Sequence, residues 1–263
     1  LISKAADKGI VFLAETRWGD EIPGMLMQQL GGRRVLHTPA KVTDNLGYSG
    51  GVAAIIPSYW HPGSYSTTAL VPHYVLQVTK TLQSIQQHFV IAYLRPGQEE
   101  DIVKTWEEAW QENPPVGPVL LCGDFNAAAL DPAHPLSRLL EAHGLVDVSP
   151  AGATHRASNG KRQQLDKFYI RDQAVLVGQI VPCARIGYLA ADAVGHSPVY
   201  MRLRRNTDNP EDAKWPVFSA IPAAACTRKN PEYQRLQNQL IRLQRADHPD
   251  FSPEHAQNLL DSF

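Results

Sequence analysis

The sequence is poor in cysteine, and its few cysteines follow no recognisable pattern. Cys122, Cys183 and Cys226 are the only three in 263 residues, and none of them is part of a CxxC pair. Structural zinc sites and disulfide-rich domains need paired or closely spaced cysteines, so the sequence fits neither class. We therefore expect each cysteine to be a small apolar side chain in a reducing, intracellular compartment.

Long apolar runs and an excess of one charge are also missing. No run reaches the length of about 18 apolar residues that a membrane-spanning helix needs, so we expect no membrane span. The formal net charge is −1, so no overall field attracts the protein to nucleic acid or to a membrane surface. Contact with a polyanion would have to come from a local patch. The chain is 43% hydrophobic and 19% charged, an ordinary balance for a folded domain.

The start of the chain lacks both an initiator methionine and a signal peptide. Leu1 lies within what reads as the end of a helix. We therefore expect either a fragment of a longer chain or a wrongly assigned gene start.

Short apolar runs alternate with helical patterns over the first 205 residues. The expected strands are residues 9–14, 50–56, 74–78, 89–94, 118–122, 165–170, 175–181 and 197–203. The expected helices are residues 98–112 and 135–143, and Gly144 ends the second of these. Strands outnumber helices, and hairpins mix with helical crossovers. This order predicts an α+β domain of two packed mixed β-sheets with helices outside.

The character of the sequence changes after Arg205. Residues 206–230 are rich in Pro, Asn, Asp and Ala without periodicity, which is typical of a linker. Residues 231–263 are predicted to form a helical tail, in which Leu236, Leu240 and Leu243 recur at helical spacing and need a partner. The predicted division is a domain at 1–205, a linker and this tail.

Four polar segments accompany the expected strands. They are Glu15-Thr16 after the first strand, the GDFN segment 123–126, the QLDKFYI segment 164–170 and the GHSPV segment 195–199. A carboxylate at a strand end can activate water, an amide can donate to charge on phosphate, and a buried Asp can orient a His. Taken singly, each has a plainer interpretation: a surface Glu, an Asx turn, a solvent-facing Asp or a structural His.

Taken in order, these segments resemble the endonuclease/exonuclease/phosphatase superfamily. Gly50-Gly51-Val52-Ala53 and Tyr93-Leu94-Arg95-Pro96 fall between them at suitable spacing, and the resemblance covers residues 1 to about 204. Thr154-His155-Arg156, followed by Asn159-Gly160, is most similar to endonuclease domains of non-LTR retrotransposons. A linker and helix after the domain would suit a polyprotein that continues towards a reverse transcriptase.

The resemblance implies a fold, a cofactor and site residues. The fold would be a four-layer α/β-sandwich whose first strand, with its metal-binding Asn, is missing. Glu15 would bind a divalent cation, Mg²⁺ with Mn²⁺ as the alternative. The implied roles are phosphate contact for Tyr93, water activation for Asp124, transition-state binding for Asn126, orientation of His196 for Asp166, and contact with the scissile phosphate for His196. The reaction would be in-line hydrolysis of a phosphodiester.

Basic residues gather before the QLDKFYI segment. They are His155, Arg156, Lys161, Arg162, Lys167 and Arg171. Arg156, Lys161 and Arg162 are the predicted contacts to the backbone phosphates of DNA. The alternative is a solvated basic loop.

A further departure from the family pattern opens the possibility of a chain without catalytic activity. Gly195 stands where the family usually has an Asp before the last His, and Asp192 reaches the site only if its loop bends. The first prediction is a DNA endonuclease, with the nucleus as its compartment. The alternatives are a phosphatase or phosphodiesterase for a small molecule or lipid, and a catalytically impaired remnant or binding module.

Overall fold

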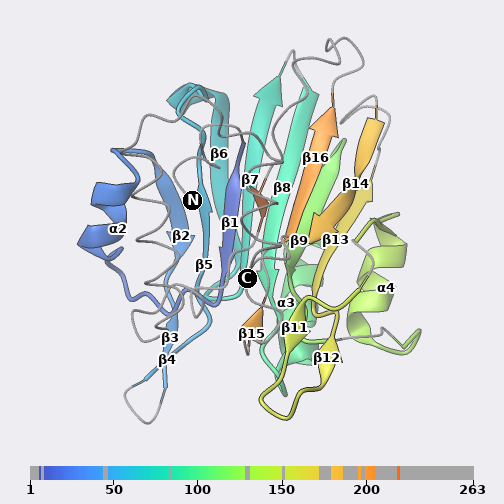
Figure 1. Cartoon of the computed structure of the whole chain (residues 1–263). Helices are drawn as coiled ribbons and strands as arrows, with labels where there is room; N and C mark the ends of the chain where they lie inside the picture. The colour runs from blue at the N-terminus through green and yellow to red at the C-terminus, as the bar shows by residue number, and fades with distance from the viewer. Residues whose placement is uncertain are drawn as a thin grey trace.

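The structure is a computed structural model of the chain (Figure 1). It describes residues 6, 9–43, 47–82, 85–127, 131–149, 152–171, 179–185, 195–196, 199–204 and 218–219. Asp192, the predicted tail and most of the predicted linker lie outside these residues. Within the described ranges, every helix is too short or too polar to cross a membrane.

A six-stranded mixed sheet forms the centre of the structure, in the order β10-β13-β9-β8-β7-β6. Its strands are β6 (Tyr65–Val71), β7 (Val75–Leu82), β8 (Ile85–Tyr93), β9 (Val119–Asp124), β10 (Val146–Asp147) and β13 (Asp166–Arg171). Strands β8 and β9 are parallel, whereas the other neighbours are antiparallel. Parallel neighbours need a crossover, and the helix α3 (Glu99–Glu112), which helical periodicity predicted, supplies it.

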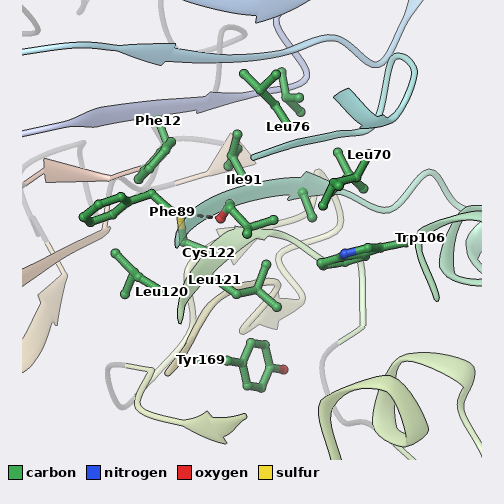
Figure 2. Packing of buried hydrophobic residues seen from close by; sticks show 14 of the residues in the cluster. Phe12, Leu70, Leu76, Phe89, Ile91, Trp106, Leu120, Leu121, Cys122 and Tyr169 are labelled. Carbon is green, nitrogen blue, oxygen red and sulfur yellow. Dashed lines mark hydrogen bonds between the residues drawn. The ribbon is translucent and has the colours of Figure 1, made fainter. Parts of the chain in front are cut away.

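A second sheet packs against one face of the first. It contains β1 (Val11–Ala14), β5 (Val52–Ile55) and β2 (Val35–Thr38), in the order β1-β5-β2. Alternate residues of a strand face opposite sides, so Phe12 and Ala14 enter the core between the sheets while Val11 and Leu13 enter a smaller outer cluster. Figure 2 shows Phe12 pointing toward Phe89 of β8. Burial on both faces explains why this strand reads as a continuous apolar run.

The prediction of two mixed sheets is only partly right. The α+β class and the mixed six-stranded sheet are confirmed, but the β1-β5-β2 sheet is antiparallel throughout. Strands β1 and β2 run in the same direction, and the helix α2 (Gly24–Gln29) lies between them in the chain. Because β5 lies between them, they are not neighbours and form no parallel pair.

Helices cover the other face of the large sheet. Ile102, Val103, Trp106 and Trp110 of α3 are buried, and the two Trp rings lie 5.1 Å apart. Figure 2 shows Trp106 and Leu121 on this side of the sheet. The helix α4 (Pro135–Ala142) begins where His134 accepts a hydrogen bond from the Leu136 N–H, as the sequence predicted within a residue.

Smaller strands complete the described structure. They are β3 (Lys41–Val42), β4 (Tyr48–Ser49), β11 (His155–Arg156), β12 (Arg162–Gln163), β14 (Gln179–Arg185), β15 (Gly195–His196), β16 (Val199–Arg204) and β17 (Phe218–Ser219), together with the 3-10 helix η1 (Pro62–Ser64). Strand β17 falls within the predicted linker, where it pairs with β16 and lies next to β1. In Figure 1, β11, β12 and β15 lie together at one end of the molecule.

Candidate active site

Strand register brings three of the predicted site residues together. Tyr93 at the end of β8 is the partner of Asp124 at the end of β9, and Asp124 is the partner of Asp166 at the start of β13. Paired residues on neighbouring strands point to the same face of the sheet. Phe89 and Leu120 lie on that face too, so the three polar side chains close one end of the core between the sheets.

Gly123 lets β9 approach β8 immediately before Asp124. It has a φ of +155°, and a Cβ atom there would lie 1.9 Å from the carbonyl oxygen of Ala92. Only glycine permits so close an approach between two backbones. Gly123 therefore helps to fix where the Asp124 carboxylate lies.

The imidazole of His196 lies between two carboxylates. Its Nδ1 atom is 2.8 Å from Oδ2 of Asp166, a hydrogen bond, and its Nε2 atom is 3.6 Å from Oδ2 of Asp124. The Asp166 carboxylate holds a proton on Nδ1 and orients the ring. The predicted orientation of His196 by Asp166 thus has the required geometry.

Burial and charge shift the pKa of both Asp124 and His196. Loss of water raises the pKa of Asp124, and the negative charge of Asp166 adds to this effect. Burial acts to lower the pKa of His196, but the hydrogen bond and charge of Asp166 outweigh it and raise the pKa to about 9. The raised pKa of His196 keeps its ring charged at neutral pH, and the charged ring lies between the Asp166 and Asp124 side chains.

Thr154 and His155 support this cluster. The Thr154 side chain is buried, and its Oγ1 atom accepts hydrogen bonds from the N–H groups of Leu165 (3.0 Å) and Asp166 (2.9 Å). The His155 ring packs against the His196 ring with 4.5 Å between centroids. Both residues belong to the segment Thr154-His155-Arg156, which resembles the retrotransposon endonuclease domains. The sequence alone assigned neither of them a catalytic or metal-binding role.

Asn126 lies in the turn that follows β9. It has a φ of +50°, and its backbone N–H donates to Oδ1 of Asp124 at 3.0 Å. Its side-chain Nδ2 donates to the carbonyl oxygen of Leu94 at 2.8 Å. The amide is therefore held in place with one of its two hydrogens already bound.

Glu15 adjoins this cluster from the second sheet. Glu15 lies near the Tyr93 hydroxyl, whose pKa is raised by burial and by the charges of Glu15 and Asp124. The Oε1 atom of Glu15 accepts two hydrogen bonds, from Nε (3.1 Å) and Nη2 (2.5 Å) of Arg17. The sequence patterns did not single out Arg17. Its position two residues after Glu15 is the feature that could have indicated this ion pair.

The donors at the site fit a hard divalent cation. The ligand atoms of Asp124, Asp166 and His196 lie within 4.8 Å of one another, and Glu15 supplies a further carboxylate nearby. Two buried carboxylates beside one imidazole leave negative charge that a cation would compensate. Oxygen-rich sites of this kind suit Mg²⁺ or Mn²⁺ better than soft metals.

The hairpin of β11 and β12 borders the cluster. Arg156 pairs with Gly195 in the β11–β15 ladder, and Arg162 pairs with Arg156 across the hairpin. Lys161 and Arg162 are exposed, whereas Arg156 is half-buried. The three predicted DNA contacts therefore lie on one hairpin beside the strand of His196, although Arg156 and Arg162 share the face of this ladder opposite to His155 and His196.

Two members of the predicted basic cluster lie elsewhere. Lys167 is buried and follows Asp166 on β13, so its side chain points to the opposite face of the sheet. Arg171 ends the same strand, and its guanidinium donates to the carbonyl oxygens of Pro115 and Gly117. Strand geometry thus removes both residues from the site.

Comparisons with known proteins establish the fold. No protein-family model matches the chain, and no curated protein matches it. An endonuclease/exonuclease/phosphatase family protein from Leptotrichia buccalis is similar in structure, with a TM-score of 0.54 and 14% identity over 77% of this chain and 90% of that chain. The endonuclease domain of TRAS1, a telomere-specific non-LTR retrotransposon, has a TM-score of 0.51 and 14% identity over 74% of this chain and 98% of that one.

A conserved protein of unknown function from Enterococcus faecalis also matches, with a TM-score of 0.50 and 14% identity over 77% of this chain and 90% of that chain. At such low identity, these similarities show the fold alone. The chain therefore has the fold of the endonuclease/exonuclease/phosphatase superfamily.

Proposed function

We propose that this protein is a divalent-cation-dependent phosphodiesterase that cuts the backbone of DNA, in the manner of the endonuclease domains of non-LTR retrotransposons. The observation that carries the proposal is the position of His196 between Asp166 and Asp124. A downstream reverse transcriptase domain and a nuclear location belong to the same proposal.

Asp124 is the group that removes a proton from the attacking water. Its raised pKa brings it nearer neutrality, where a general base is most effective. As the water oxygen attacks phosphorus, its proton passes to the Asp124 carboxylate and the bond to the leaving oxygen breaks. His196, oriented by Asp166, presents its charged Nε2–H to an oxygen of the phosphate.

Tyr93 and Asn126 position the phosphate. The raised pKa of Tyr93 keeps its hydroxyl protonated, so that it acts as a hydrogen-bond donor. Asn126, anchored through Leu94, directs its remaining amide hydrogen to the same oxygens. A divalent cation bound by Glu15 would stabilise the negative charge that develops on the phosphate and the leaving oxygen.

The basic hairpin of Arg156, Lys161 and Arg162 favours DNA as the substrate. It pairs with the strand of His196, where its long basic side chains can contact phosphates that flank the cleaved one. A phosphatase for a small molecule would need no contacts to flanking phosphates, because its substrate has none. Because the net charge of the chain is −1, this hairpin has to supply the attraction locally.

Nicking of supercoiled plasmid in Mg²⁺ tests the proposal. We expect nicking by the full chain that stops in excess EDTA and in Asp124→Asn and His196→Gln. Lys104→Ala, on the exposed side of α3, is the matched control. Hydrolysis of p-nitrophenyl phosphate without plasmid nicking would identify a small-molecule phosphatase instead.

A second candidate function rests on Gly195. If this glycine replaces a carboxylate that the reaction needs, the chain binds DNA without cutting it. Two results together would support this binding module. The protein binds DNA but leaves it intact under all nicking conditions, and Asp124→Asn does not alter the binding.

A further inference from the structure

The carboxylate of Glu15 is already paired within the chain. Arg17 donates to its Oε1 atom through both Nε and Nη2, at 3.1 and 2.5 Å. Charge-assisted hydrogen bonds of this kind are stronger than neutral ones. Glu15 is also the residue expected to bind a cation, so the same carboxylate has two competing uses.

The backbone holds the two side chains in this pairing. Glu15 and Arg17 both have left-handed conformations, with φ values of 52° and 53°. Residues other than glycine adopt this region at a cost, so surrounding contacts have to maintain it. The N–H of Arg17 donates to the Gly50 carbonyl oxygen, and that of Thr16 donates to Gly51.

Gly51 makes this attachment possible. A Cβ atom at Gly51 would lie 2.4 Å from Oγ1 of Thr16, and its own φ is +82°. Any other residue would place a side chain against Thr16, next to the start of β5. The ion pair is therefore built on a fixed turn.

The two partners differ in their freedom to move. The Arg17 side chain is 60% exposed, whereas that of Glu15 is 24% exposed and lies near Tyr93. Arg17 can leave the pair by rotating into water without opening the core, but Glu15 stays beside Tyr93. A positive charge held here also repels an approaching cation.

From this geometry we infer that Arg17 is an internal competitor of the divalent cation for the Glu15 carboxylate, and so sets the cation affinity of the site. The inference rests on the proposed cation site, but not on cleavage of DNA. A cation at Glu15 would share with Arg17 a carboxylate whose negative charge Arg17 already compensates, and this competition weakens cation binding. A purely structural role for Arg17 predicts the opposite, because loss of Arg17 would then leave Glu15 misplaced and weaken binding.

Calorimetric titration with Mg²⁺ tests the inference on the full chain. We expect Arg17→Gln to lower the Kd for Mg²⁺ by about fivefold to tenfold, since it removes both the pairing and the repulsion. Arg17→Lys keeps the charge but loses the two-point contact, so its Kd should lie between the other two. In a Glu15→Gln background, Arg17→Gln should change the Kd by less than about twofold.

An unchanged or higher Kd in Arg17→Gln, with its thermal unfolding like that of the unaltered protein, would overturn the inference. If Arg17→Gln unfolds at a lower temperature, Arg17→Lys decides: a Kd equal to or above that of the unaltered protein then rejects competition. Plasmid nicking by the unaltered chain is scored separately. If Arg17→Gln binds Mg²⁺ more tightly but the unaltered chain does not nick plasmid, competition by Arg17 is supported and the nuclease function is rejected.

Discussion

The Nδ1 atom of His196 lies 2.8 Å from Oδ2 of Asp166, although the two residues are 30 positions apart in the chain. Neither position is informative alone, since a single Asp and a single His both have ordinary structural uses. Held together and buried, they form an oriented imidazolium. This pairing gives the site a directed charge next to Asp124.

Replacing Asp166 by Asn should uncouple His196. We expect the pKa of His196 to fall from about 9 toward its ordinary value, because the negative charge that supports the imidazolium is gone. Nicking should fall by about 10²-fold or more. NMR titration of the imidazole measures the first effect independently of activity. A His196 pKa that stays near 9 in Asp166→Asn would show that other groups hold the proton.

Gly123→Ala should damage both the sheet and the site. The added methyl group would meet the Ala92 backbone, so β8 and β9 would have to separate. Overpacking of this kind costs about 1–3 kcal/mol in unfolding free energy. Urea unfolding measures the loss, with Gly24→Ala as control, since a Cβ atom at Gly24 meets nothing within 4 Å. Equal stability of the two variants would contradict the close approach.

Thr154→Val should destabilise the fold because two buried N–H groups lose their acceptor. Leaving such groups unpaired costs about 1–3 kcal/mol each in unfolding free energy. Any water molecule that hydrogen-bonds to them reduces this cost. Thr154→Ser keeps the hydroxyl and should retain most of the stability. Chemical denaturation of the three proteins provides the comparison. A serine variant as unstable as the valine variant would assign the effect to the lost methyl group instead.

The free energy of unfolding should decrease in mild acid, because His88 is buried in its neutral form. Burial lowers the pKa of this imidazole, which lies between the Thr79 hydroxyl and the Val116 carbonyl. As the pH drops below the unfolded value of about 6.5, the unfolded chain binds a proton that the folded chain refuses. The contribution is thus full above this pH and is lost below it.

The matching measurement is the unfolding free energy from pH 7.5 to pH 5. His88→Gln should show a shallower loss than the unaltered protein over this range, whatever its stability at pH 7.5. Parallel curves would mean that His88 is as easily protonated in the folded protein as in the unfolded chain.

Lys161→Ala should weaken DNA binding in a salt-dependent way. Each phosphate contact contributes a slope of about −0.9 to the dependence of log K on log salt for duplex DNA. We expect the variant to reduce the slope by about 1, whereas Lys104→Ala on α3 should leave it unchanged. Fluorescence anisotropy with a labelled duplex at several salt concentrations measures both. Equal slopes for all three proteins would place the DNA away from the hairpin.

The apolar periodicity of the sequence determined the buried elements. Strand β1 and helix α3 were predicted because a strand buried on both faces and an amphipathic helix each leave a clear pattern. Strand β6 was missed, because its middle residues Ser66, Thr67 and Thr68 are polar and exposed. An edge strand of this kind is held by backbone hydrogen bonds to its neighbour, which leave no trace in hydrophobicity.

The residue types of the site were also legible in the sequence, since carboxylates and a histidine beside buried strands are chemically costly unless they are used. Only the tertiary structure decided which of them meet. Register placed Asp124, Asp166 and Tyr93 on one face, the β11–β15 ladder brought His196 to them, and the period of two sent Lys167 to the other side. These relations depend on pairing between distant segments, whose energy is spread over the whole core and belongs to no single stretch of the chain.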